Sequence, residues 1–150
     1  MEPRMRQPAT ITPGAMQALH ALAGSVRKTG LPEVTALLVE LRASQINGCS
    51  FCVDMHSREL KESGVADERI FAVGAWRESP YFTDAERAAL ALTEALTRIA
   101  DRPNPVPDDI WEEATAHYNE QELAGLILEI AAINVWNRLN VAVRQIAGSA

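Results

Sequence analysis

Apolar residues recur every three or four positions along most of this 150-residue chain, the spacing that places them on one face of an α-helix. No segment shows the strict alternation that is typical of a half-buried β-strand. The pattern therefore predicts an all-α protein of about seven helices. The expected helices span about 12–29, 32–47, 49–63, 67–76, 107–118 and 119–146, with one more that begins after Thr83.

Local signals set these bounds. Thr83 with Glu86 forms a capping box, in which each residue satisfies a free backbone amide of the other, and Asn119 with Glu122 repeats it. Three prolines between 101 and 107 indicate a loop rather than a domain boundary, because neither half could bury a good core alone. We expect residues 1–11 to form a flexible tail and residues 12–150 to form a single helical domain.

The most apolar segment, 123–136, has apolar residues on several faces of its predicted helix. It contains Glu129 and Asn134 and is shorter than the roughly 20 residues that a helix needs to span a bilayer. Such a helix is central to its own bundle or is shared with another subunit. We therefore expect a buried core helix and a homo-oligomer.

Composition and charge narrow the function classes. Hydrophobic residues make up 47% and charged residues 23%, as in ordinary globular proteins, and the formal net charge is −6. An acidic chain without a basic cluster is unsuited to nucleic acid, so we expect no nucleic-acid partner and no membrane partner. The proline-interrupted start lacks the apolar core of a signal peptide, which predicts a cytoplasmic protein.

The candidate chemistry lies in the segment 41–60, which holds both cysteines of the chain. On a helix that begins near Cys49, Cys52 and His56 return to nearly the same face. The first turn of a helix favours a thiolate, and His56 could take a proton from Cys52 or pair with it. In a reducing compartment a pair this close is more often catalytic, redox-active or metal-binding than structural.

Two other interpretations of this segment stay open. Cys49 and Cys52 could simply be buried as small apolar residues. They could also join His56 in a structural zinc site, although such a site normally has four ligands and the segment offers three of the usual type. We expect neither a metal nor another cofactor.

The pattern Glu40-x11-Cys52-x3-His56, with Cys49 inside SQINGCSFC, resembles the carboxymuconolactone decarboxylase-like superfamily and specifically its alkyl hydroperoxidase D (AhpD)-like branch. The later YFTDAERAALALTEALTRIA and NVWNRLNVA are also similar to that branch, so the resemblance covers roughly 32–144. It implies an AhpD-like helical bundle, assembly into trimers or hexamers, and thiol-dependent peroxidase chemistry without a cofactor.

The resemblance also implies roles for four residues. Cys52 would attack the peroxide, Cys49 would resolve the product as a disulfide, His56 would accept the proton, and Glu40 would orient or recharge His56. Periodicity alone places Glu40 off the apolar stripe of its helix, as a solvated side chain. One position departs from the branch: Phe51 stands where the best-known members carry a relay histidine.

We therefore predict an antioxidant enzyme that reduces hydrogen or organic hydroperoxides, with an external dithiol or dithiol protein as the reductant. Two alternatives differ in class. The first is a protein disulfide reductase or redox sensor without peroxide turnover. The second is a decarboxylase of the carboxymuconolactone type, whose activity would not need the two thiols.

Overall fold

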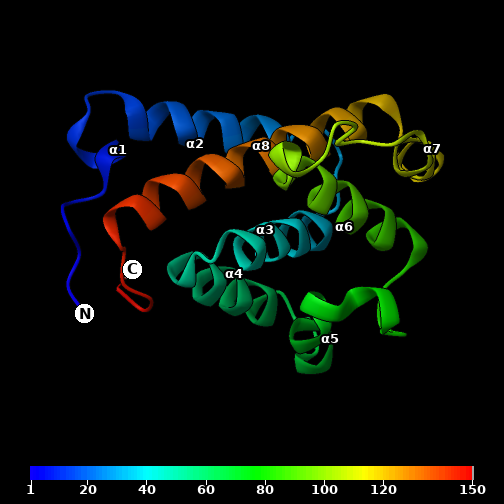
Figure 1. Cartoon of the computed structure of the whole chain (residues 1–150), viewed down its shortest axis with the longest axis horizontal. Helices are drawn as coiled ribbons and strands as arrows, with labels where there is room; N and C mark the ends of the chain where they lie inside the picture. The colour runs from blue at the N-terminus through cyan, green and yellow to red at the C-terminus, as the bar shows by residue number, and fades with distance from the viewer. Residues whose placement is uncertain (150) are drawn as a thin grey trace.

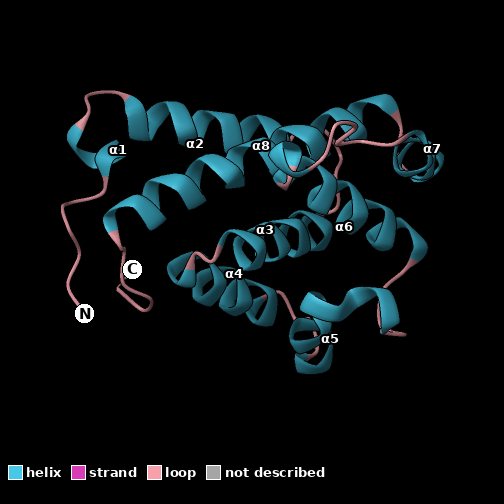
Figure 2. Cartoon of the chain, in the orientation of Figure 1, coloured by secondary structure: helices cyan, strands magenta, loops and turns pink. Residues whose placement is uncertain are grey.

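The computed structural model of the chain describes residues 1–149, which contain helices and no strand (Figures 1 and 2). This arrangement confirms the all-α prediction. The α-helices in chain order are α1 (Pro8–Ile11), α2 (Ala15–Val26), α3 (Glu33–Asn47), α4 (Ser50–Glu62), α5 (Asp67–Ala72), α6 (Asp84–Thr97), α7 (Asp108–His117) and α8 (Glu120–Val143). Two 3₁₀ segments, η1 (Val73–Glu78) and η2 (Ile99–Asp101), follow α5 and α6.

The predicted helix boundaries at the centre of the chain are confirmed. Thr83 and Glu86 form the expected capping box at the start of α6, and Asn119 with Glu122 forms the second one at the start of α8. Gly48 ends α3 with a φ of 68°, a left-handed conformation that glycine adopts without steric cost. The chain then turns directly into α4, so the cysteines lie at a sharp bend between two packed helices.

The predicted start of the first helix at Thr12 is wrong. Gly14 adopts a left-handed φ of 81° and splits the segment into the short helix α1 and the longer helix α2. The segment 1–11, expected to be a tail, contains α1 and contacts the end of α8, where the backbone amide of Arg4 donates to the Val143 carbonyl at 2.8 Å. Its flexibility stays a prediction.

The fourth predicted helix is also divided. Ala66 rather than Asp67 precedes α5 as its cap, and α5 tightens into the 3₁₀ segment η1 at Val73. Ala75 lies outside helical geometry, with φ −123° and ψ 32°, which marks the bend. The result is a compact corner beneath α3 and α6, visible in green in Figure 1.

Helix α8 is the central helix of the fold and packs on α2, α3, α4, α6 and α7 (Figure 1). Its inner face is buried, whereas Leu128, Val135 and Val141 are 39–46% exposed on the outer face. The helix is long and apolar enough to cross a membrane by length and composition alone, a test that core helices of soluble proteins also pass. Its packing against five helices identifies α8 as the core of a helical domain.

Two apolar clusters hold the bundle together, and α3 and α6 contribute to both. Val39 of α3 lies in the cluster with α2, α7 and α8, while Leu38 and Leu41 lie in the cluster with α4, α5 and η1. Helix α3 is therefore buried on more than one side and is fixed in position. This rigid helix carries α4 and the cysteine pair.

Buried amides fix the end of α3 against α8. The Asn47 side chain donates to Asn134 Oδ1 at 3.0 Å and to Asn137 Oδ1 at 2.9 Å, and Asn137 donates to Ser44 Oγ at 2.9 Å. Asn137 is fully buried, so leaving its amide without partners would be costly. This network holds the α3–α4 bend, and with it the first turn of α4, at a fixed place on α8.

Candidate active site

The two cysteines form a disulfide at the start of α4. Cys49 is the cap residue of the helix, and its Sγ accepts a hydrogen bond from the Cys52 amide at 3.3 Å. Their Cα atoms are 5.3 Å apart. Cys49 is 2% exposed and Cys52 is fully buried, so both cysteines are removed from bulk solvent. A disulfide closing so short a loop adds little stability, which favours a redox role over a structural one.

Asn140 of α8 supplies a polar contact to Cys52. Its Nδ2 donates to the Cys52 Sγ at 3.4 Å, and its Oδ1 accepts from Gln7 Nε2 at 3.3 Å. A donor at this sulfur stabilises negative charge there when the disulfide opens. Sequence reasoning missed both residues, although Asn140 lies in the NVWNRLNVA motif and Gln7 in the segment taken as a tail.

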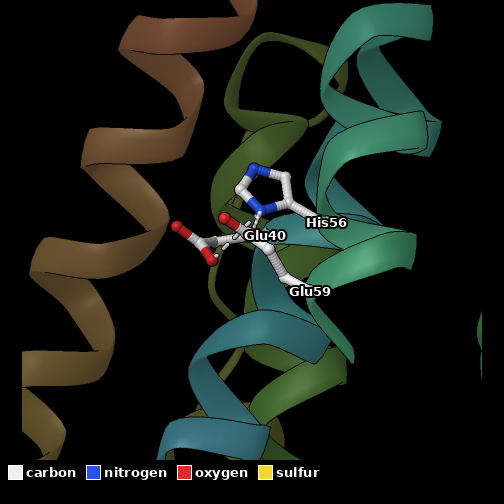
Figure 3. A group of neighbouring side chains, drawn as sticks. All are labelled: Glu40, His56 and Glu59. Carbon is white, nitrogen blue, oxygen red and sulfur yellow. Dashed lines mark hydrogen bonds and ion pairs between the residues drawn. The ribbon is translucent and has the colours of Figure 1, made fainter. Parts of the chain in front are cut away.

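His56 lies one turn beyond Cys52 on the same face of α4 and is 4% exposed. Its Nδ1 is 2.8 Å from Glu59 Oε2 and 3.3 Å from Glu40 Oε2 (Figure 3). A carboxylate beside Nδ1 favours the tautomer that carries its proton there, leaving Nε2 as the acceptor. Within residues 1–149 no hydrogen-bond partner reaches the buried Nε2. This nitrogen is therefore the position from which His56 can accept a proton.

Glu40 lies on α3 and faces His56 across the α3–α4 interface (Figure 3). Its side chain is 20% exposed. Periodicity suggested a solvated side chain, and the structure contradicts that expectation because α8 and α4 cover this face of α3. Glu59, three residues after His56, was missed, although its i, i+3 spacing to His56 was visible in the sequence.

A second buried acid, Glu129 of α8, interacts with Glu40. Burial, the charge of Glu129 and a hydrogen bond between the two side chains raise the pKa of Glu40 to about 10, and the Arg27 charge opposes this only in part. Burial also raises the pKa of Glu129, which is 7% exposed. Two adjacent carboxyl groups that are both removed from water share a proton, so the Glu40–Glu129 pair keeps one that separate carboxyl groups would release.

A cavity of about 600 Å³ opens beside the acid cluster, which consists of Glu40 and Glu59 around His56. Phe51, Met55, Trp136 and other apolar side chains form part of its wall, and Glu40 and His56 reach its interior. Phe51 stands where the best-known members of the AhpD-like branch carry a relay histidine. In this structure it lines the cavity. Glu33, Glu40, Glu59 and Glu62 line the cavity together with Arg27.

The same cluster is the place where a cation could bind. Donor atoms of Glu40, His56 and Glu59 all lie within 4.8 Å of one another. One imidazole and two carboxylates match the ligands that zinc accepts. These donors differ from the zinc ligands considered from the sequence, because Cys49 and Cys52 are bonded to each other here.

Comparison with known proteins gives a consistent result. Residues 13–95 match the model of the carboxymuconolactone decarboxylase family. The chain is 34% identical to the uncharacterized protein YdfG of Bacillus subtilis over 93% of both chains. It is 39% identical to the alkyl hydroperoxide reductase AhpD of Hyphomonas neptunium, over 44% of this chain and 38% of that protein.

A solved structure extends the similarity to the whole fold. A candidate antioxidant defence protein AhpD of unknown function from Agrobacterium tumefaciens superposes with a TM-score of 0.90 at 39% identity. The match covers 99% of this chain and 100% of that one. The expected AhpD-like helical bundle is therefore confirmed.

Proposed function

Because the chain belongs to the carboxymuconolactone decarboxylase family and has an AhpD-like fold, we propose that it is a thiol-dependent peroxidase for hydrogen or organic hydroperoxides. One observation carries the proposal. The redox-active pair Cys49–Cys52 begins a helix whose next turn presents His56, a buried imidazole with an unpartnered Nε2. A cysteine in the first turn of a helix, with a proton acceptor one turn further along, is an arrangement that can activate a thiol.

The reaction follows from these positions. In the reduced protein, His56 takes the proton of Cys52, and the thiolate attacks one oxygen of the peroxide. The O–O bond breaks, Cys52 becomes a sulfenic acid, and the leaving alkoxide takes up a proton as an alcohol. The Cys49 thiol then displaces water from the sulfenic acid and forms the disulfide.

Glu40 supports His56 in this cycle as a positioning residue. Its Oε2 lies 3.3 Å from His56 Nδ1, and its carboxyl group shares a proton with Glu129. The contact at Nδ1 leaves Nε2 free as the acceptor, and the proton that Nε2 takes from Cys52 is the one that passes to the leaving alkoxide. In this way His56 and Glu40 replace a relay that runs through a histidine at the Phe51 position.

The cavity beside His56 indicates the substrate class. Its wall combines apolar side chains with four glutamates, faced by Arg27. Apolar contacts suit an alkyl or aryl group, and the surrounding acids disfavour an anionic substrate. We propose that uncharged organic hydroperoxides bind in this cavity.

Thiol counting tests the proposed chemistry. The reduced protein is treated with one equivalent of peroxide, and free thiols are measured before and after. We expect loss of both thiols in the parent and a trappable sulfenic acid on Cys52 in Cys49→Ser. Thiols that do not react with peroxide would overturn the peroxidase assignment.

The same disulfide would also serve a protein disulfide reductase or redox sensor. Steady-state peroxide consumption with an excess of dithiol separates these functions, because a sensor is oxidised once and then stops. A decarboxylase would keep its activity in Cys49→Ser/Cys52→Ser, whereas the peroxidase would lose it completely.

We also propose that the protein acts as a homo-oligomer, a trimer or hexamer, in the cytoplasm. The exposed apolar residues Leu128 and Val135 on the outer face of α8 support this assembly. Light scattering on the purified protein gives the subunit number, and a monomer would contradict the proposal.

A further inference from the structure

The disulfide reaches a second cavity, separate from the one that contains His56. This cavity has a volume of about 410 Å³ and lies where α8 ends and α4 begins. Cys49 lines it, whereas Cys52 and the acid cluster do not. Only Asn140 and Gln145 line both cavities. Cys52 lines neither of these two cavities, so the second cavity leads to the disulfide through Cys49.

The charge of the second cavity is opposite to that of the first. Arg4 and Arg144 line it, and among residues 1–149 no acidic side chain contributes to its wall. It also lies at the N-terminal end of α4, where the helix dipole favours negative charge. The whole chain has a net charge of −6, so this positively charged cavity beside the disulfide differs in sign from the protein as a whole.

Backbone geometry singles out Arg144. Among residues 1–149 it is the one non-glycine residue with positive φ, at 55°. It ends α8 in the left-handed conformation that normally selects glycine, and a branched or long side chain there costs about 1 kcal/mol. An arginine at this position is not the choice that stability favours, which indicates a use for its charge.

From these observations we propose that the cavity formed by Arg4, Arg144 and Cys49 binds the reductant of the disulfide, and that this reductant is an anionic thiol, one that carries a carboxylate near its sulfur. The inference rests on the proposed function in that it assigns the reductive half of the cycle. The arginines attract the carboxylate and leave the sulfur facing Cys49.

Reduction of the protein disulfide takes two successive thiol–disulfide exchanges. A thiolate of the reductant attacks the Cys49 Sγ, the bond between Cys49 and Cys52 breaks, and Cys52 leaves as a thiolate. Asn140 Nδ2, which lies 3.4 Å from the Cys52 Sγ, stabilises this leaving group. A second thiolate then attacks the reductant sulfur of the mixed disulfide and releases Cys49. Two thiols of the reductant are oxidised to its disulfide, and the protein disulfide is reduced to two thiols.

The test uses oxidised protein without peroxide, so that it is independent of the peroxidase activity. Thiol release is followed with 3-mercaptopropionate and with 3-mercaptopropionamide, which differ in charge but not in length, and each rate is divided by the thiolate concentration. At low ionic strength we expect the anionic thiol to react about 10-fold faster, and this ratio to fall toward about 2 at high salt.

Variants separate charge from structure. Arg144→Gly suits the left-handed backbone and removes the charge, so it should keep the fold and lower the ratio about 3-fold, as should Arg4→Gln. Arg144→Lys should retain the ratio. Arg58→Gln is the matched control, because Arg58 pairs with Asp54 on the exposed side of α4 and lines a different cavity.

Peptide mapping of the quenched reaction should place the mixed disulfide on Cys49. A ratio that is the same in Arg144→Gly and the parent, a faster neutral thiol, or an adduct on Cys52 would each overturn the inference. If peroxide fails to oxidise the thiols but the charge preference holds, the reductant site stands and the peroxidase assignment falls.

Discussion

His56 Nδ1 lies 3.3 Å from Glu40 Oε2 across the interface between α3 and α4. This contact joins the first turns of the cysteine helix to the buried helix before it. Glu40 in turn interacts with Glu129 of α8, and burial raises the pKa of both carboxyl groups. Through Glu40, His56 of α4 is therefore linked to both α3 and α8.

Glu40→Gln should slow oxidation of the reduced protein by peroxide about 10-fold, because glutamine fills the same space but lacks the carboxyl group that orients His56 through Nδ1. Stopped-flow measurement of thiol loss at neutral pH checks this. Glu33→Gln is the control, since Glu33 lies on the same helix and lines the same cavity. A Glu40→Gln variant that reacts as fast as the parent would remove Glu40 from the mechanism.

The raised pKa of Glu40 predicts that the protein loses stability as pH rises. The folded chain keeps this proton while the unfolded chain releases it above the ordinary value of 4.5, so the unfolded state binds fewer protons between 4.5 and about 10. The free energy of unfolding should therefore fall with pH, by at most about 1.4 kcal/mol per pH unit for one group.

Urea unfolding at pH 5.5 and 8.5 measures this dependence. Glu40→Gln should make the two free energies of unfolding more nearly equal, mainly by stabilising the protein at the higher pH. Glu33→Gln should keep the difference of the parent. Equal slopes in the parent and Glu40→Gln would show that Glu40 is ionised in the folded state.

Asn140→Leu should slow the reaction of Cys52 with peroxide about 10-fold, which corresponds to the loss of one hydrogen bond to the reacting sulfur. Gln7→Ala should have a smaller effect, because Gln7 acts only by orienting Asn140. Gln121→Leu, an exposed change at the start of the same helix, is the control. An unchanged rate in Asn140→Leu would leave its amide a structural role alone.

Gly125→Ala should destabilise the contact between α8 and the turn that follows α2 by about 1–3 kcal/mol. A Cβ at this position would lie 2.1 Å from Thr29 Oγ1, which itself donates to the Val26 carbonyl at 2.7 Å. Adding Thr29→Ala should recover part of the loss, since it removes two of the close atoms. Gly24→Ala, where a Cβ meets open space, should instead stabilise the protein.

Removal of metal should leave the peroxide reaction intact, because the proposed chemistry needs only thiols and protons. Added Zn²⁺ should slow it by binding Glu40, His56 and Glu59, whose donor atoms lie within 4.8 Å of one another. Dialysis against a chelator followed by rate measurement checks both statements. Activity that disappears on chelation and returns with zinc would identify a metal centre instead.

Local sequence signals were sufficient to predict most of the helices of the fold. The helix period, the two capping boxes and the Asn47-Gly48 stop act within a few residues, so they are visible in the sequence and the structure confirms them. The N-terminal segment was predicted less well. Gly14 breaks the first helix through its backbone conformation, and α1 is too short for its periodicity to be recognised.

For the candidate site, the sequence by itself determined the cysteine pair and the position of His56 on the same helical face, because three and four residues are the spacing of one turn. Only the tertiary structure decided the rest. Asn140 meets Cys52 from 88 residues away and Gln7 meets Asn140 from 133, and Glu129 sets the charge of Glu40 from another helix. These contacts depend on how helices cross, which periodicity along one helix does not encode.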